Sequence, residues 1–292
     1  MTPLTIRLVS INIWDLPIPL PRTQWAARRR RLLDGLPRLD ADLILLQEAF
    51  RPGMRRAILH ALPALHADAH ARGRRWFVLV PMDRAGGLMT LSRWPILSTH
   101  HQPARRFRRM KPDERIGRKG CLWTRIATPA GELLVGNVHL YAGSTPIDAH
   151  VRTIQTRHLL ARGDSRPDAP TVLAGDWNWD LDFEHSEHGP IGHVELLQAG
   201  FREVADGRSD GIATMDPRHN AFARYVPWHR PARRLTHVFF RGPGIGAGAE
   251  APSLCLHDPP VSDHYGLRVT LTMADGKRPM ANGKRSTWYS DP

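Results

Sequence analysis

The chain has 292 residues, 41% of them hydrophobic, and a formal net charge of +13. This length can fill a large α/β layer structure with a sizeable core, and no apolar run approaches the ~18 residues needed to span a bilayer, so we expect no transmembrane segment. The charge predicts attraction to polyanions such as nucleic acid, anionic lipid or polyphosphate, and it says nothing about the fold.

The N-terminus and the two cysteines bear on where the protein acts. The first ten residues run into a strand-like pattern without a basic flank or a cleavage site, so we expect no signal peptide and a cytoplasmic protein. Cys121 and Cys255 fit neither a zinc spacing nor a disulfide framework, and we interpret both as reduced thiols, with a single bridge as the alternative. We expect a monomer with one domain over residues 1–273 and a flexible basic tail over residues 274–292.

In chain order, alternating apolar residues first predict a strand over residues 4–14, with Asn12 near its end. A continuous apolar run over residues 42–47 is typical of a strand in a sheet covered on both sides, and Glu48 stands at its end. Helices are predicted over residues 24–36 and 52–62, and neighbouring strands joined by a turn are predicted over residues 76–80 and 87–92.

Arginine and lysine gather in two stretches of the chain. Arg28 to Arg31 lie in the first predicted helix, and we interpret them as a solvated helix face. The stretch from Arg105 to Lys119 has neither a helical nor a strand period, so we place it in a long loop. Because a long loop inside a compact domain is usually functional or disordered, this loop is a candidate for binding a phosphate backbone.

The densest group of polar side chains follows an apolar run at residues 170–173, where the sequence reads AGDWNWD. Asp176 and Asn178 stand two residues apart, so they are expected to point the same way and to converge on one ligand. Taken alone, the pattern is more typical of a turn. Around it, the sequence predicts a hairpin over residues 121–126 and 132–140, helices over 147–160 and 194–199, and final strands over 235–240 and 265–271.

Polar groups at five predicted strand ends form the candidate site. A buried sheet with so many acids, amides and imidazoles at its strand ends is costly in free energy unless they share a ligand. Carboxylate and amide oxygens without thiolates suit Mg²⁺, with Mn²⁺ as a substitute, and a phosphate is then the natural substrate group. These residues are Asn12, Glu48, His139, Asp176 with Asn178, and Asp263 with His264.

Histidine offers a second metal hypothesis. His185, His188 and His193 lie close together in an irregular stretch, without cysteines or a recognisable set of partner ligands. We therefore interpret them as surface histidines and not as a zinc site. In the candidate site, His139 and His264 are left free for proton transfer and hydrogen bonding.

The chain resembles the endonuclease/exonuclease/phosphatase superfamily of metal-dependent phosphoesterases. Its motifs follow the order of the family from about residue 4 to residue 272. The resemblance implies an α/β (α+β) fold, a four-layer sandwich in which two mixed β-sheets pack face to face with helices on both outer faces. The motifs are SINIW with Asn12, LLQEAF with Glu48, SRWPI at residues 92–96, GNVHL with His139, AGDWNWD with Asp176 and Asn178, and SDHYGL with Asp263 and His264.

The resemblance also implies a role for each residue in the hydrolysis of a phosphodiester by in-line attack of water. Glu48 would hold the catalytic Mg²⁺, and Asn12 would lie beside it. Asp176 is expected to orient or deprotonate the attacking water. Asp263 is expected either to assist that step or to approach the metal.

Phosphate contacts are implied for the other residues of the site. Asn178 is expected to bind a phosphate oxygen, and His139 to stabilise the pentacoordinate state or protonate the leaving oxygen. His264 and Lys119 are expected to contact the phosphate. Many relatives place an aspartate in the strand before the SDH motif, where this chain has Thr236. Since threonine cannot stabilise an imidazolium as a carboxylate does, we expect either a less basic His264 with reduced activity, or another acid in the place of the aspartate.

The substrate stays open at this point. LLQEAF, the RKG step at residues 118–120 and the run at residues 151–155 resemble the neutral sphingomyelinase-like branch, which acts on a phospholipid headgroup. Trp177 and Trp179 could box a choline by cation–π attraction, stack a nucleobase, or belong to the core. The basic loop would repel choline and attract nucleic acid, so a DNA or RNA nuclease is the alternative. A phosphomonoesterase and a catalytically weak protein that binds nucleic acid or an anionic lipid surface are further alternatives.

Overall fold

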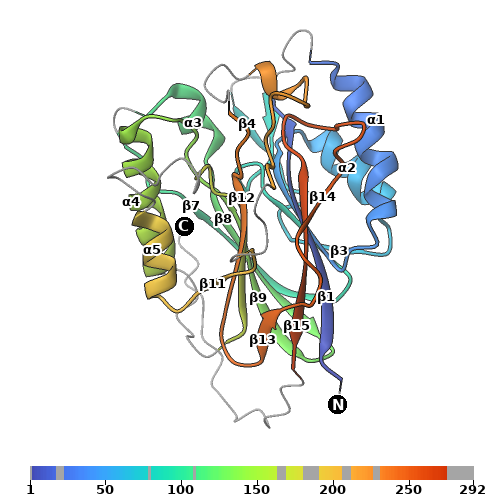
Figure 1. Ribbon diagram of the computed structural model, residues 1–292. Coiled ribbons are helices and arrows are strands. Elements are labelled where there is room, and N and C mark those ends of the chain that lie inside the picture. Colours follow the sequence, from blue (N-terminus) through green and yellow to red (C-terminus); the bar gives the residue numbers. More distant parts are fainter. Residues whose placement is uncertain are drawn as a thin grey trace.

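Figure 1 shows the computed structural model of the protein, which describes residues 2–17, 23–77, 80–107, 110–162, 169–179, 191–205, 212–225 and 231–274. Two β-sheets pack face to face, and helices cover both outer faces. This arrangement confirms the four-layer sandwich that the resemblance implies. The basic tail expected over residues 274–292 lies, beyond Ala274, outside the described residues.

The helices divide between the two outer faces. Their bounds are α1 (Trp25–Gly35), α2 (Pro52–Ala61), α3 (Pro112–Gly117), α4 (Pro146–Arg162) and α5 (Ile191–Gln198), with the 3₁₀ helices η1 (Leu36–Leu39) and η2 (Ala223–Tyr225). The four predicted helices correspond to α1, α2, α4 and α5. In Figure 1, α1 and α2 cover the sheet at the right, and α4 and α5 cover the sheet at the left. None of the described helices has the length and apolar character needed to cross a membrane.

The first sheet is built around two parallel strands. Its strands are β1 (Leu4–Asp15), β2 (Leu43–Ala49), β3 (His66–Ala67), β6 (Met89–Ser92), β13 (Ile245–Ala247), β14 (Ser253–Cys255) and β15 (Gly266–Met273). They follow the order β13-β15-β1-β2-β6-β3, and β14 also pairs with β15. β1 and β2 run parallel, and β15 and β6 run antiparallel on either side of them.

The second sheet repeats this plan. Its strands are β7 (Ile96–Pro103), β8 (Gly120–Thr128), β9 (Gly131–His139), β10 (Thr171–Asp176), β11 (Arg202–Glu203) and β12 (Thr236–Arg241). They follow the order β11-β12-β10-β9-β8-β7. β9 and β10 run parallel, and β8 and β12 are their antiparallel neighbours.

Successive side chains of a strand point to opposite faces of its sheet, so alternate positions decide what lies between the sheets. On β1, Ile6 and Leu8 pack against residues of the second sheet. Val9 and Ile11 face the other way and pack against Leu32 of α1 and its neighbours. The apolar core is therefore divided into a layer between the sheets and an outer layer beneath the helices of each sheet.

At one end of the molecule the rows between the sheets change from apolar to polar. The row on β1 continues from Leu8 through Ser10 to Asn12. The parallel strands β1, β2, β9 and β10 end here, and β12 and β15 begin here, so their polar ends meet. The buried polar residues that continue these rows are Ser10, Asn12, Gln47, Asn137, His139, Asp176 and Thr236.

A pair of buried amides joins the two sheets below this end. Gln47 Nε2 donates a hydrogen bond to Asn137 Oδ1 at 2.8 Å. Asn137 Nδ2 donates to the backbone carbonyls of Leu46 and Met89, each at 3.1 Å. Apolar packing is non-directional and leaves one sheet free to slide over the other. These directional bonds therefore fix the end of β9 against the ends of β2 and β6.

Asn137→Leu should lower the free energy of unfolding by about 2–4 kcal/mol, because it removes the Asn137 hydrogen bonds to the Leu46 and Met89 carbonyls and the shortest hydrogen bond of the buried Gln47 amide. Urea unfolding at neutral pH measures this difference. The double variant Gln47→Leu/Asn137→Leu should lose less than the sum of the two single variants, since each single variant already loses the bond between the two amides. Strictly additive losses would show that the two side chains do not act as a pair.

One strand prediction is wrong, and one strand of the second sheet is missing from the predictions. Residues 76–80 do not form one strand beside the strand at residues 87–92: β4 (Arg75–Phe77) and β5 (Val80–Met82) pair with each other, and β6 pairs with β2 and β3. β7 was not predicted, because its sequence ILSTHHQP has no alternating apolar pattern. It pairs only with β8 among the described strands, and such an edge position needs few apolar residues.

The prediction that Arg28 to Arg31 form a solvated helix face is wrong for Arg28. Arg28 is buried, and its guanidinium carbon lies 4.7 Å from the centroid of the Trp14 ring. A buried guanidinium needs acceptors, and the partners here come from distant parts of the chain that a helical pattern does not reveal. It donates hydrogen bonds to the backbone carbonyls of Ile13, Trp14, Thr23 and Val261.

The long basic loop is also only partly confirmed. The helix α3 interrupts it, with Pro112 at the first helical position, where a missing N–H costs nothing. Arg108 and Arg109 lie outside the described residues, and Lys119 is buried.

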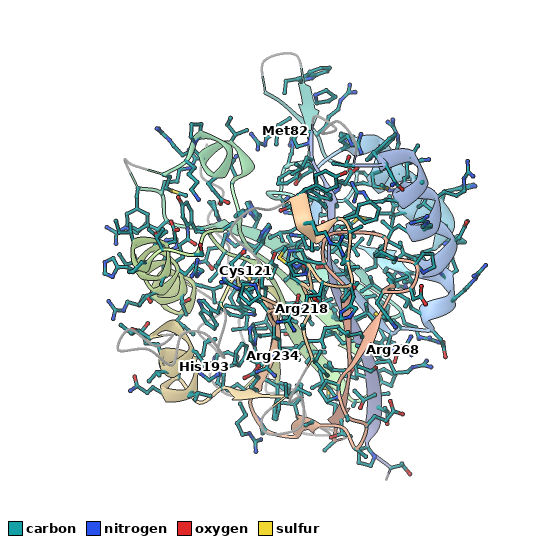
Figure 2. The ribbon with its side chains drawn as sticks, turned by 45° about the horizontal axis from the view of Figure 1, so that its top comes forward. Met82, Cys121, His193, Arg218, Arg234 and Arg268 are labelled. Atoms are coloured by element: carbon teal, nitrogen blue, oxygen red, sulfur yellow. The ribbon has the colours of Figure 1, made fainter. Side chains whose placement is uncertain are left out.

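Both cysteines are buried free thiols, as expected, and Figure 2 shows Cys121 in the interior of the molecule. Burial raises the pKa of the Cys121 thiol well above its ordinary value and that of the Cys255 thiol to about 11. Cys121 packs in the apolar layer of the second sheet with Trp177 and Leu159 of α4, whereas Cys255 packs in the layer of the first sheet with Leu32 of α1.

Candidate active site

The carboxylate of Asp176, at the end of β10, is the centre of the candidate site. Its Oδ2 accepts a hydrogen bond from Asn12 Nδ2 at 3.0 Å across the gap between the sheets, and its Oδ1 accepts one from the backbone N–H of Asn178 at 3.0 Å. Burial raises the pKa of this carboxyl, but the combined lowering of the pKa by His264, His139 and the Asn12 amide is larger than that rise. The pKa therefore lies below its ordinary value, and the carboxylate stays ionised at neutral pH.

Two imidazoles approach the same carboxylate oxygen. His139 Nε2 lies 3.5 Å and His264 Nε2 lies 3.8 Å from Asp176 Oδ2. Burial, with the nearby Lys119 cation, lowers the pKa of His139 well below its ordinary value, so this ring is neutral at neutral pH. Among the described residues, neither ring nitrogen of His139 nor His264 Nδ1 has a hydrogen-bond partner. Because buried polar atoms are normally paired, these nitrogens are the groups that a substrate would engage.

Glu48 is the next-to-last residue of β2, on the opposite sheet, and its Oε1 lies 3.9 Å from His139 Nε2. Its Oε2 is buried and has no hydrogen-bond partner within the described residues. Burial raises the pKa of this carboxyl to about 7, the Lys119 cation opposes the rise, and the Asp263 carboxylate adds to it. The backbone of Glu48 has a φ of 56°, a left-handed conformation that costs a non-glycine residue about 1 kcal/mol or more.

The chain after Glu48 is held by a buried arginine and a glycine. Arg55 donates hydrogen bonds to the backbone carbonyls of Ala49 and Leu88, at 3.0 and 2.9 Å. Gly87 accepts a hydrogen bond from the Ala49 N–H, and its φ is 79°. A Cβ atom at this glycine would lie 3.1 Å from Glu48 Cα, so only glycine allows this close approach.

The oxygen donors at this end fit a hard divalent cation. A buried carboxylate oxygen without a partner, such as Glu48 Oε2, is satisfied by a cation. In the part of the chain that the structure describes, no three His, Cys, Asp or Glu side chains gather closely enough to hold an ion by themselves. Mg²⁺ is commonly held by one or two carboxylates and keeps several waters, which suits Glu48 with Asn12 and Asp263 nearby.

A buried serine positions the last acid and histidine of the site. Ser262 Oγ donates to Asp263 Oδ1 at 3.0 Å and accepts a hydrogen bond from the His264 N–H at 3.3 Å. Burial raises the pKa of the Asp263 carboxyl, while His264 and the serine hydroxyl oppose the rise. Ser262 belongs to the SDHYGL motif, so its place in the motif is the signal that could have identified it.

Asn178 follows the end of β10 in a turn with a φ of 54°. Its Nδ2 donates a hydrogen bond to the Leu140 carbonyl at 3.1 Å, which ties the turn to the residue after His139. Asn178 thus lies beside Asp176, as expected, although a turn and not strand alternation brings it there.

The aromatic box considered for Trp177 and Trp179 is not formed, because both side chains are core residues. They are 0% and 2% exposed, and their rings stack with centroids 4.6 Å apart. Both lie in the apolar layer of the second sheet with Phe239, on the opposite side of that sheet from Asp176. The alternation of side chains along β10 turns Trp177 away from the site.

Lys119 lies beside the site but already has a partner. Its Nζ lies 2.7 Å from Glu114 Oε1, and both side chains are buried. Burial lowers the pKa of this ammonium, but the carboxylates of Glu114 and Glu48 raise it more, so it lies above its ordinary value. Lys119 is therefore a fixed cation near Glu48, and no sequence motif pointed to Glu114 as its partner.

Thr236 pairs with Asp176 in the register of β12 and β10, and it is fully buried. Within the described residues, neither Thr236 Oγ1 nor His264 Nδ1 has a hydrogen-bond partner. No other described acid therefore takes the place of the aspartate that many relatives carry here.

The remaining histidine hypothesis concerns His193, since His185 and His188 lie outside the described residues. His193 Nε2 lies 3.3 Å from Glu203 Oε2, and His237 Nδ1 lies 2.8 Å from Glu203 Oε1. Figure 2 shows His193 below the centre of the molecule, away from Met82 at the opposite end. The two imidazoles contact the same carboxylate, and among the described residues no group of three His, Cys, Asp or Glu side chains is arranged to hold a metal ion.

Glu48→Gln should stabilise the metal-free protein at pH 8. A carboxyl whose folded pKa of about 7 exceeds its ordinary value of 4.5 binds its proton more tightly in the folded state. Its contribution to stability therefore falls as the pH rises from about 4.5 to 7, and the loss is complete above 7. Glutamine has no such charge, so the variant should gain on the order of 2–3 kcal/mol at pH 8 and little at pH 5.

Urea unfolding in EDTA at both pH values measures this gain. The exposed Glu250, replaced with glutamine, is the control for removing an acid at the surface. A gain of equal size at pH 5 and pH 8 would contradict a raised pKa at Glu48.

Comparisons with known proteins identify the family and the fold of the chain. The model of the Endonuclease/Exonuclease/phosphatase family matches residues 9–264. No curated protein sequence matches the chain. A similar solved structure is sphingomyelinase C from Streptomyces griseocarneus, with 19% sequence identity and a TM-score of 0.65, where the match covers 93% of this chain and 99% of that chain. A second is a mutant beta toxin from Staphylococcus aureus with bound magnesium ions, with 16% identity, a TM-score of 0.64 and coverage of 93% of this chain and 100% of that chain. A third is D. rerio TDP2 complexed with a single-strand DNA product, with 18% identity, a TM-score of 0.64 and coverage of 91% of this chain and 98% of that chain. At these identities the likenesses establish the fold.

Proposed function

Because the chain belongs to the endonuclease/exonuclease/phosphatase family, whose members hydrolyse phosphoester bonds, we propose that it is a Mg²⁺-dependent phosphodiesterase. The observation that carries this proposal is the meeting of Glu48, from one sheet, with His139 and Asp176 of the other. The beta toxin structure with bound magnesium supports a divalent metal in this fold, and Mn²⁺ is a substitute of similar chemistry.

The metal would be held by Glu48, with Asn12 and Asp263 beside it. Bound there, Mg²⁺ supplies Lewis-acid polarisation of a phosphoryl oxygen and neutralises the charge that develops during attack. The unpaired, buried Oε2 of Glu48 supports this assignment.

Asp176 orients the attacking water. The hydrogen bonds from Asn12 and from the Asn178 N–H fix the direction of both carboxylate oxygens. A carboxylate held in this way presents its free lone pairs in a fixed geometry, which lowers the entropic cost of aligning the water with the phosphorus.

The imidazoles and the asparagine act on the phosphate. His139 is neutral, so its N–H can donate a hydrogen bond to the pentacoordinate state or a proton to the leaving oxygen. His264 approaches Asp176 from the segment before β15 and contacts one phosphoryl oxygen, and Asn178 contacts a second phosphoryl oxygen. Lys119 contributes positive potential next to Glu48.

We propose nucleic acid as the substrate class, ahead of a choline phospholipid. The burial of Trp177 and Trp179 removes the aromatic support for a choline site. The net charge of +13 favours a polyanion over a zwitterionic headgroup. Sphingomyelin remains the second candidate, since the fold is shared with sphingomyelinase C.

The purified protein should hydrolyse bis-p-nitrophenyl phosphate with Mg²⁺, lose this activity in EDTA and regain it on adding Mg²⁺. Asp176→Asn and Glu48→Gln should each lower kcat by roughly 10²–10⁴ without loss of folded protein, because they remove water orientation and the metal carboxylate. Asp34→Asn, on the exposed face of α1, is the matched control. Full turnover in EDTA, or unchanged turnover in both site variants, would refute the site.

The substrate class is tested under the same conditions with sphingomyelin vesicles and with single-stranded DNA. We expect kcat/KM to be higher for DNA, and Glu48→Gln to abolish both reactions, which excludes a contaminating nuclease. Faster hydrolysis of sphingomyelin would support the second candidate and reject nucleic acid.

A further inference from the structure

A pocket of about 360 Å³ lies between α1, the start of α2 and the hairpin of β4 and β5. Of the described residues that line it, four are arginines and none is acidic. The arginines are Arg29, Arg51, Arg56 and Arg74. Figure 2 shows Met82 at the base of the hairpin, next to Pro81 of the pocket wall.

One wall of the pocket is fixed by a tryptophan, an acid and an arginine. Trp25 Nε1 donates a hydrogen bond to Asp15 Oδ1 at 3.0 Å, and Arg51 Nε donates to the same oxygen at 2.9 Å. The Arg51 guanidinium carbon lies 3.8 Å from the centroid of the Trp25 ring. Asp15 compensates one of the four arginines, so the pocket keeps an excess of positive charge.

The other three arginines carry that excess. Among the described residues, Arg29, Arg56 and Arg74 form no ion pair, in contrast to Arg51. The pocket also receives the amino end of α2, whose first turn contains no acidic side chain. The partial positive charge of a helix amino end adds to the attraction for an anion. The wall is therefore rigid and the charge is available to a ligand.

The pocket lies close in the chain to Glu48, the carboxylate proposed to hold the metal. β1 carries Asn12 and then Asp15, and β2 carries Glu48 and is followed by Arg51. Since three peptide steps separate Glu48 from Arg51, their Cα atoms lie at most ~11 Å apart. From this arrangement we infer that the pocket binds a second phosphate of the substrate, next along a nucleic acid strand from the phosphate that is hydrolysed.

This inference rests on the proposed function. The chemistry of the pocket favours a single strand of nucleic acid over a choline headgroup or a bilayer surface. A choline headgroup carries one phosphate and one cation, and no acid lines the pocket to bind that cation. A bilayer presents its charges on a flat surface, whereas these arginines line a hollow. A single strand repeats its charge along a flexible backbone, so it can place one phosphate at Glu48 and another in the hollow.

Gly53, in the first turn of α2, offers a mild way to fill the pocket. A Cβ atom at Gly53 would have no heavy atom within 4 Å, so a side chain can start there without a clash at its Cβ. In Gly53→Glu the new carboxylate competes with the phosphate for the arginines. Gly53→Gln has nearly the same size without the charge. Arg38→Gln, on the exposed part of η1 at the far end of α1 and roughly 15–20 Å from Trp25, changes the net charge by the same amount.

The readout is the ratio of kcat/KM for a single-stranded oligonucleotide to kcat/KM for bis-p-nitrophenyl phosphate, which has no second phosphate. Gly53→Glu should lower this ratio about tenfold, and Gly53→Gln and Arg38→Gln should lower it less than about threefold. An equal effect of Gly53→Glu and Gly53→Gln, or an equal loss with both substrates, overturns the inference while hydrolysis of the small ester continues to support the proposed function.

Binding without turnover gives a second, independent test. In EDTA, the slope of log K against log salt for a fluorescent single strand should become less steep by about 0.7 in Gly53→Glu, the value for one phosphate contact. An unchanged slope overturns the inference. So does a loss of binding to phosphatidylserine vesicles with no loss for the oligonucleotide, which would assign the pocket to a lipid surface. If the wild type does not hydrolyse the small ester, the proposed function fails and the slope still decides whether the pocket binds a phosphate.

Discussion

The candidate site depends on hydrogen bonds that cross between two separately built sheets. The apolar layer between them supplies stability but no fixed alignment, because contacts among Leu, Val and Ile side chains can be exchanged at little cost. Gln47 with Asn137, and Asn12 with Asp176, permit only one alignment. In that alignment the ends of four parallel strands meet, and residues that are far apart in the chain surround one carboxylate.

The sequence predicts the placement of side chains correctly where the alternation of inward- and outward-facing side chains continues to the end of a strand. Asn12, His139 and Asp176 are polar continuations of apolar rows, and the motifs mark where each row stops. Trp177 is the contrary case: it belongs to the opposite row, and alternation alone assigns it to the core. Arg28 and Glu114 could not be predicted, since their partners are distant backbone carbonyls in one case and a single lysine after a helix in the other.

Several unfavourable contributions to the stability of the fold lie at this same end of the molecule. Glu48 combines a left-handed backbone with a buried carboxyl of raised pKa, and Asn178 shares that backbone conformation. Ring nitrogens of His139 lack partners among the described residues. Such departures are expected where a site is prepared for a charged ligand, and the buried arginine and amide networks around it offset their cost.

The two hidden thiols divide between the two helical layers. Cys121 lies in the layer covered by α4, and Cys255 lies in the layer covered by α1. Neither is a thiolate at neutral pH while the protein is folded, so neither reacts readily with an alkylating reagent. Each becomes reactive only when its own layer lifts from its sheet. The chain therefore contains two native reporters, and alkylation followed by peptide mass mapping can tell whether the two sides of the sandwich open together or one at a time.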